Sequence, residues 1–185
     1  MKGKTMSLLT LQSLQSVATF GALSLSLLAI GGVANMAAVA LGHRGPLARY
    51  DRPIWERGLG RNKTWRGLLV GLVVGAVAAP LVWLLAGFWI GLPFYWWVGP
   101  VVGLATMGGD AVTSGLKRRL RLQPGACHWT DSLDPAFGVF VGAAAIGLGL
   151  GGAALCCAVA CLVLHYAHPL VSRLGFRAGC KAVPH

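Results

Sequence analysis

Long apolar runs without charge constrain this chain more than any other feature of its sequence. One run extends from Val17 to Leu41, and another extends from Leu68 to about Ile90. About 20 helical residues cross the hydrocarbon layer of a bilayer, where only helices and closed barrels satisfy their backbone hydrogen bonds. The first run also exceeds the roughly 7–15 apolar residues of a signal peptide. Together with a mean hydropathy of +0.67, the pattern predicts an all-α integral membrane protein.

Two further stretches extend the pattern to five spans in a single domain, residues 1–185. The aromatic run at 94–97 resembles an interfacial belt and opens a short third span, which we expect to end at Gly108-Gly109. Residues 135–169 are too long for one helix, and the glycine run within them predicts two short spans folded there. We also expect a break near Pro80 in the second span. The predicted spans are 17–41, 68–90, 93–107, 135–150 and 152–170.

The sixteen lysines and arginines lie mostly between these spans. Seven are in loop 43–67, four in loop 108–134, three in the C-terminal tail and two in the N-terminal leader. Five spans place both loops and the tail on one side, which the positive-inside rule assigns to the cytoplasm, with the N-terminus outside. This topology accounts for the net charge of +11 without nucleic acid, for which no motif is present. It predicts a multi-pass protein of the cell (inner or plasma) membrane whose two charged cytoplasmic loops form the site.

Three of the five acidic residues lie close together in the second loop. They are Asp110, Asp131 and Asp134. Asp110, Ser114 and Lys117 are spaced i, i+4 and i+7, with Arg121 at i+11, so a helix would place them on one face. A carboxylate, a hydroxyl and cations on one face can hold Mg²⁺ and the oxygens of a polyphosphate. The alternatives are a solvated charged face and, for Asp134 before a proline, a helix N-cap.

The segment 60–67, GRNKTWRG, supplies cations, an amide and a hydroxyl just before an apolar run. Backbone N–H groups at the start of a helix suit phosphate. The spacing of a P-loop is absent, and a basic anchor flanking a span is the alternative. Carboxylates and many cations, without a Ser-His-Asp or Cys-His arrangement, favour phosphoryl or nucleotidyl transfer, in which Mg²⁺ neutralises developing charge.

These motifs resemble those of the CDP-archaeol synthases and, more distantly, the phosphatidate cytidylyltransferases. The resemblance rests on GDxxxSxxKRR at 109–119, on Pro124-Gly125 and on DSLDPAFG at 131–138. It also rests on Asp51 followed eight residues later by GRNKTWRG, on Asn35 and on the ending AGCKAVPH. It covers nearly the whole chain, and the paired motifs are specific.

The resemblance implies five transmembrane helices and Mg²⁺-dependent transfer of CMP from CTP to a lipid phosphate, giving a CDP-lipid and pyrophosphate. The catalytic residues that it implies are Asp110, Lys117, Asp131 and Asp134. The metal ligands that it implies are Asp110, Asp131 and Asp134. The residues implied to bind phosphate or to orient the nucleotide are Asn62, Lys63, Thr64, Arg66, Ser114 and Arg118.

Two alternatives remain beside this interpretation. A CDP-alcohol phosphotransferase would also use CDP-lipids, but its DGxxAR…GxxxDxxxD pattern is absent. A non-catalytic membrane protein that binds anionic lipid or nucleotide would explain the basic loops but not the costly acids. The sequence leaves open the lipid (an archaeal ether lipid, phosphatidate or a polyprenyl phosphate) and whether the chain forms a homo-oligomer.

Overall fold

The structure, a computed structural model, describes residues 2–41, 47–89, 91–120 and 133–177. These residues are helical or form connections between helices, and their only β-type pairing is an isolated bridge between Pro53 and Thr64. The prediction of an all-α protein is therefore confirmed. The elements are α1 (Lys2–Ala40), η1 (Ala48–Tyr50), α2 (Glu56–Leu59), α3 (Trp65–Val82), η2 (Trp83–Gly87), α4 (Val98–Arg119), α5 (Leu133–Ala145) and α6 (Gly149–Arg177).

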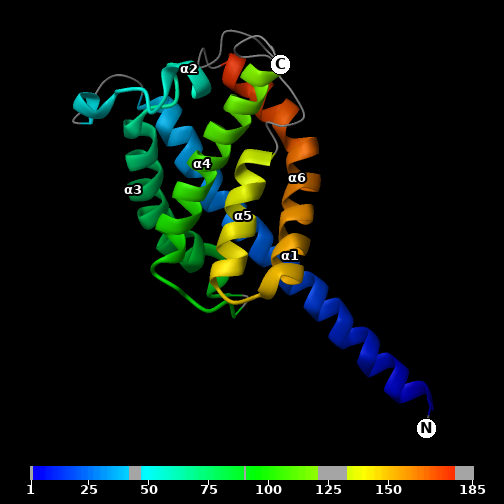
Figure 1. The fold of residues 1–185 in the computed structure, drawn as a ribbon. Helices are drawn as coiled ribbons and strands as arrows, with labels where there is room; N and C mark the ends of the chain where they lie inside the picture. The colour runs from blue at the N-terminus through cyan, green and yellow to red at the C-terminus, as the bar shows by residue number, and fades with distance from the viewer. Residues whose placement is uncertain (1, 42–46, 90, 121–132, 178–185) are drawn as a thin grey trace.

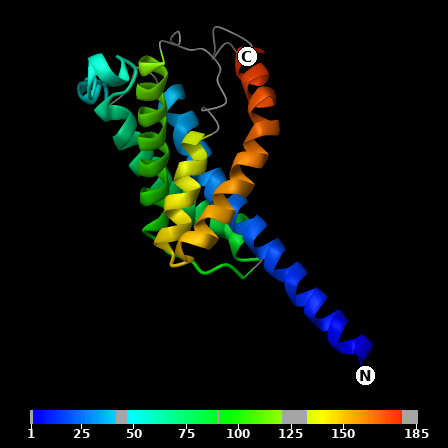
Figure 2. The same cartoon turned by 45° about the vertical axis from the view of Figure 1, so that its right-hand side comes forward.

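The long helices α1, α3, α4, α5 and α6 pack side by side into a bundle, and consecutive helices run in opposite directions (Figures 1 and 2). The N-terminal part of α1 extends beyond the bundle, at the end opposite the C-terminal end of α6 (Figure 1). Residues 47–67 and 110–120 share one end of the bundle, which we call the polar end. The described parts of the two charged loops therefore meet in space.

Three segments of the described chain are long and apolar enough to cross a membrane: Val17–Ala40, Trp65–Gly87 and Gly149–Ala167. Helix α5 is apolar but shorter, and α4 carries charged residues in its last turn. Large apolar side chains point outward from the bundle, with Leu85 and Trp89 both 78% exposed. Such an apolar surface suits contact with lipid and would be costly in water. The chain is thus a membrane protein, and the count of five spans stays a prediction.

Helices α3 and α4 touch through their backbones. A Cβ atom added at Gly103 would lie 2.0 Å from the carbonyl oxygen of Gly71, and one added at Gly75 would lie 2.3 Å from that of Gly99. Small residues four apart on each helix allow this close approach, as in many membrane helix pairs. We call these four glycines the glycine seam. It sets the register that brings the start of α3 next to the second half of α4.

Helix α4 also holds α1 and α5, through Thr106 and Gly109. The Thr106 side chain is fully buried, and Cβ atoms at Gly31 of α1 and Gly138 of α5 would lie 2.5 and 2.1 Å from its Oγ1. A Cβ at Gly109 would lie 2.9 Å from the backbone oxygen of Asp134. The first turn of α5 therefore packs directly against α4 beside the position of Asp110.

Two helix boundaries differ from the predictions. The third span does not end at Gly108-Gly109, because α4 continues through both glycines to Arg119. Gly109 gives α5 room to approach and does not interrupt the helix. Helix α5 begins at Leu133, so Asp134 lies within its first turn and is not the N-cap.

Of the two other breaks that we expect in the apolar runs, one is present and one is not. The expected fold at the glycine run is present, because a turn joins α5 to α6 and Gly147 and Gly149 have φ of +90° and +69°. Those values lie in the left-handed region that glycine tolerates best. Pro80 does not break α3, which continues to Val82 before the π-helical turn η2.

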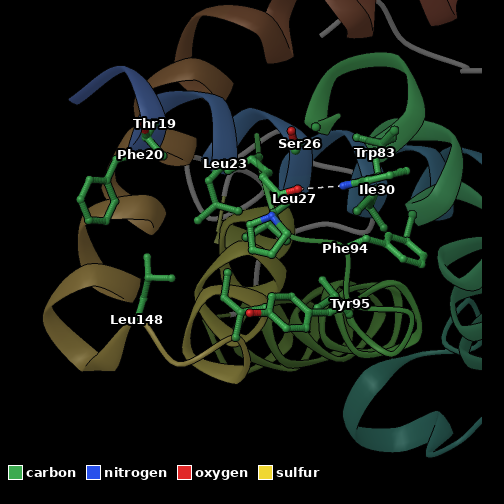
Figure 3. Close-up of a pocket in the computed structure, with 17 residues that line it drawn as sticks. Thr19, Phe20, Leu23, Ser26, Leu27, Ile30, Trp83, Phe94, Tyr95 and Leu148 are labelled. Atoms are coloured by element: carbon green, nitrogen blue, oxygen red, sulfur yellow. Dashed lines mark hydrogen bonds between the residues drawn. The ribbon is translucent and has the colours of Figure 1, made fainter. Parts of the chain in front are cut away.

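A cavity of about 280 Å³, the apolar cavity, lies at the end of the bundle away from the charged residues (Figure 3). Apolar and aromatic side chains dominate its lining, which contains no charged residue in the described chain. Trp83 Nε1 donates a hydrogen bond to the backbone oxygen of Leu92 at 2.8 Å, which ties η2 to the connection before α4. The lining residues labelled in Figure 3 are Thr19, Phe20, Leu23, Ser26, Leu27, Ile30, Trp83, Phe94, Tyr95 and Leu148.

Candidate active site

A second cavity, of about 450 Å³, lies at the polar end, and we call it the polar cavity. The end of α1, the segment before α3, the first turn of α3 and the middle of α4 all contribute to it. Its walls therefore come from three of the long helices and from the first charged segment. The lining residues are Asn35, Ala38, Val39, Ile54, Asn62, Lys63, Thr64, Arg66, Gly67, Leu68, Met107, Asp110 and Ala111.

An ion pair between Lys63 Nζ and Asp110 Oδ2 joins the two charged segments inside this cavity. The two side chains are only 18% and 28% exposed. Two backbone hydrogen bonds fix the segment that carries Lys63: Ile54 N donates to Lys63 O at 2.8 Å, and Trp65 N donates to Arg52 O at 3.1 Å. This contact supports the expectation that the two loops supply one site.

Thr64 is the N-cap of α3. Its Oγ1 accepts a hydrogen bond from the backbone N–H of Gly67 at 3.3 Å, and the residue is 8% exposed. This bond satisfies one of the N–H groups that every helix start leaves open. A helix therefore begins directly after the GRNKT sequence, as expected. The hydroxyl predicted to orient the nucleotide also has a structural role.

Arg66 lies in the first turn of α3, where its Nε donates a hydrogen bond to Asp51 Oδ1 at 3.1 Å. The side chains of the two residues are 10% and 17% exposed. Sequence reasoning gave Asp51 no role, although its fixed place before the GRNKTWRG motif was a usable signal. The pair places this carboxylate against Arg66, a residue that lines the polar cavity.

The end of α4 packs against the segment around α2. Gly60 has φ of +89°, and a Cβ there would lie 2.7 Å from Nη2 of Arg118. A Cβ at Gly115 would lie 3.2 Å from a methyl group of Leu59. Lys117 and Ser114 are half-buried on the same helix, and neither they nor Arg118 are among the residues that line the polar cavity. The cations at the end of α4 thus lie outside the lining of the cavity.

A third ion pair, between Arg61 and Glu56, lies outside the cavity. Arg61 donates a hydrogen bond from Nε to Glu56, and the two side chains are 84% and 53% exposed. The hydrogen bond to Glu56 and the charge of that carboxylate raise the pKa of Arg61. Exposed pairs of this kind contribute little to stability. It serves as a comparison for the two pairs at the cavity.

The three predicted metal ligands are only partly within the described chain. Asp131 lies outside the described residues, as does Arg121. Within the described part, no group of three His, Cys, Asp or Glu residues is arranged to hold a metal. Asp110 and the buried Asp134 stand on helices that touch at Gly109. Carboxylate oxygens from neighbouring helices fit the ligand preference of Mg²⁺, although an ion at Asp110 would compete with Lys63.

All residues that line the polar cavity fall within a region of the chain that matches a known protein family. Residues 17–185 match a family model described as CarS-like, CDP-archaeol synthase. A CDP-archaeol synthase of Aeropyrum pernix is 33% identical over 159 residues, which cover 82% of this chain and 85% of that protein. One of Methanopyrus kandleri is 39% identical over 114 residues, covering 60% of this chain and 61% of that protein.

A shorter match covers part of another archaeal protein. A CDP-archaeol synthase of Pyrococcus furiosus is 35% identical over 74 residues, which cover 38% of this chain and 44% of that protein. The aligned parts therefore span less than two thirds of the Methanopyrus and Pyrococcus proteins. No solved structure matches the chain.

Proposed function

This chain belongs to the CDP-archaeol synthase family, and from that premise we propose that it transfers CMP from CTP to a membrane lipid phosphate. The products are a CDP-lipid and pyrophosphate. The observation that supports this most directly is the ion pair between Lys63 and Asp110, which joins the two family motifs in one cavity. The names of the relatives favour an ether-linked archaeal lipid over phosphatidate or a polyprenyl phosphate.

In the proposed reaction an oxygen of the lipid phosphate attacks the α-phosphorus of CTP. A new phosphorus–oxygen bond forms as the bond to the bridging oxygen of the β-phosphate breaks, and pyrophosphate leaves with that oxygen. Both reactants are anionic, so cations must offset their repulsion and the charge that develops on the leaving group. Lys63 and Arg66 line the cavity and would supply such charge, and Lys117 and Arg118 at the end of α4 would add to it.

Mg²⁺ is part of the proposal. Asp110, Asp131 and Asp134 would hold it, and the ion would neutralise phosphate charge and orient the oxygens. Support comes from the carboxylates of Asp110 and Asp134 on touching helices. Lys63, released from Asp110, would then be free to bind a substrate phosphate.

The proposed location is the cell membrane, with five spans and the polar end in the cytoplasm, where CTP is found. The excess of Lys and Arg on the loops at the polar end supports this orientation. In this orientation the polar cavity would lie at the level of the lipid head groups. The lipid phosphate and the soluble nucleotide would meet there.

The test is pyrophosphate release by detergent-purified protein given CTP, Mg²⁺ and one of three lipid phosphates: an archaeal ether lipid, phosphatidate or a polyprenyl phosphate. We expect release that requires both CTP and the ether lipid. Asp110→Asn should lower turnover by at least about 100-fold, because a proposed carboxylate ligand of Mg²⁺ is lost. Glu56→Gln, which removes an acid from the exposed pair, is the matched control and should keep turnover within about twofold.

A non-catalytic protein that binds lipid or nucleotide would behave differently. It would bind CTP or the lipid phosphate without releasing pyrophosphate, and Asp110→Asn would not reduce that binding. Absence of release with all three lipids, from protein that unfolds cooperatively on heating, would reject the proposed reaction.

A further inference from the structure

Arg66 is a charged side chain that is almost fully buried beside the polar cavity. The residue is 8% exposed and lines the cavity. Its Nη1 atom is buried and has no hydrogen-bond partner within the described part of the chain. A buried charged donor without an acceptor costs free energy, so proteins retain such a group mainly where a ligand supplies the acceptor.

Asp51 determines how this guanidinium is presented. Its carboxylate accepts a hydrogen bond from Arg66 Nε at 3.1 Å, and both side chains are largely shielded from solvent. A guanidinium is planar, so fixing one edge fixes the direction of the remaining donors. The contact occupies Nε and leaves Nη1 for another acceptor. The acceptors that match a guanidinium best are carboxylate and phosphate oxygens.

The walls of the cavity indicate whether Arg66 binds the phosphate of the lipid or a phosphate of the nucleotide. Ala38 and Val39 of α1 line it together with Met107 of α4, so apolar groups of membrane helices face the cations. Val39 lines the cavity but is 63% exposed, so at α1 the cavity reaches the outer surface of the bundle. That part of α1 belongs to an apolar membrane span. A molecule that combines a phosphate with hydrocarbon chains fits such an opening better than a soluble nucleotide does.

We propose that Asp51 is a positioning residue that holds Arg66 in the orientation needed to bind the phosphate of the lipid substrate in the polar cavity. This inference rests on the proposed function and deepens it by assigning one side of the site to the lipid. In this assignment, the cations at the end of α4, Lys117 and Arg118, would bind the nucleotide. Asp51 itself touches no reacting atom.

The experiment measures the KM for each substrate with the other held at saturation. Asp51→Asn should raise the KM for the lipid phosphate by about tenfold, as is usual when the partner that orients a ligand-binding group is removed. The KM for CTP should stay within about twofold. Asp51→Glu keeps the carboxylate and should recover part of the loss. Glu56→Gln, in the exposed pair of the same segment, should change neither KM.

A double-variant cycle tests whether Asp51 acts through Arg66. Arg66→Gln alone should raise the KM for the lipid more than Asp51→Asn does. Adding Asp51→Asn to Arg66→Gln should have little further effect, because the group being positioned is already gone. Additive losses would mean that Asp51 acts elsewhere and would overturn the proposal.

The remaining outcomes are also decisive. A rise in the KM for CTP alone would assign this phosphate to the nucleotide and overturn the lipid assignment. A lower melting temperature with both KM values unchanged would show that the pair of Asp51 and Arg66 contributes to stability only, and would overturn the proposal. If Asp51→Asn does not fold, Asp51→Glu and Arg66→Lys provide the same comparison.

Equilibrium binding separates this proposal from the proposed reaction. Calorimetric titration of a dialkylglycerol phosphate in detergent micelles, without CTP, measures binding whether or not the protein turns over. Weaker binding by Asp51→Asn and by Arg66→Gln would support the lipid site even for a protein that releases no pyrophosphate. Unchanged binding by both variants would overturn it.

Discussion

The two cavities of this bundle are built largely from the same helices but have opposite chemistry. Helix α1 contributes Asn35 to the polar cavity and Leu27 to the apolar one, and α3 contributes Arg66 and Ala79 in the same way. Within the described chain, charged side chains occur in the lining of the polar cavity only. The position along each helix, rather than the helix itself, therefore determines what each end of the molecule can bind. We therefore expect the reaction to take place at the polar end and the apolar end to serve as framework.

Exchanging the two charges of the cavity ion pair should produce the largest effect. In the double variant Lys63→Asp with Asp110→Lys, the pair can re-form and the polar end should keep its packing. Turnover should nevertheless fall by at least about 100-fold, because the carboxylate and the ammonium no longer face their proper substrate groups. Pyrophosphate release and the melting temperature, measured on the same preparation, check this. Recovery of turnover in the double variant would mean that the pair is only structural.

Gly103→Ala should produce the next largest effect, on stability first and on turnover as a consequence. Its Cβ would lie 2.0 Å from the carbonyl oxygen of Gly71, so α3 and α4 must separate. Overpacking of this kind costs about 1–3 kcal/mol. Thermal unfolding in detergent measures the loss. Gly108→Ala is the control on the same helix, because its Cβ would meet nothing within 4 Å. Equal destabilisation by the two variants would contradict the close contact of α3 and α4.

Trp83→Phe should have the smallest effect and tests the framework role of the apolar end. It removes the hydrogen bond from Nε1 to the backbone oxygen of Leu92, which contributes about 1 kcal/mol to stability. The melting temperature should fall slightly while turnover stays within about twofold. A tenfold loss of turnover would show that the apolar cavity participates in the reaction, and the division between the two ends would then be wrong.

The sequence was sufficient to predict the helical class and the neighbouring position of the two charged segments. The lengths of the apolar runs set the main helices, and the distribution of charge required loops 43–67 and 108–134 to share one side. The contact between Lys63 and Asp110 follows from that arrangement, although the residues are 47 positions apart. Run length and charge are local properties, so they can be read without knowing the fold.

Features that depend on a packing partner were not predictable in this way. The dipeptide Gly108-Gly109 predicts a helix break, yet α4 continues through it. The role of Gly109 is to let α5 pack closely against α4. Asp51, which pairs with Arg66 of α3, lies in the irregular segment after η1, where no periodicity fixes which side chains meet. A glycine or an acid acquires its role from what the fold places opposite it.

The glycine seam also limits how the site can change shape during a reaction cycle. Because the backbones of α3 and α4 meet directly, no layer of side chains between them can compress or slide, and the pair moves as one rigid body. The spacing between Lys63 and Asp110 is therefore set by this pair. Any widening of the polar cavity to admit a lipid or release its product must come from the other walls, the end of α1 and the segment before α3.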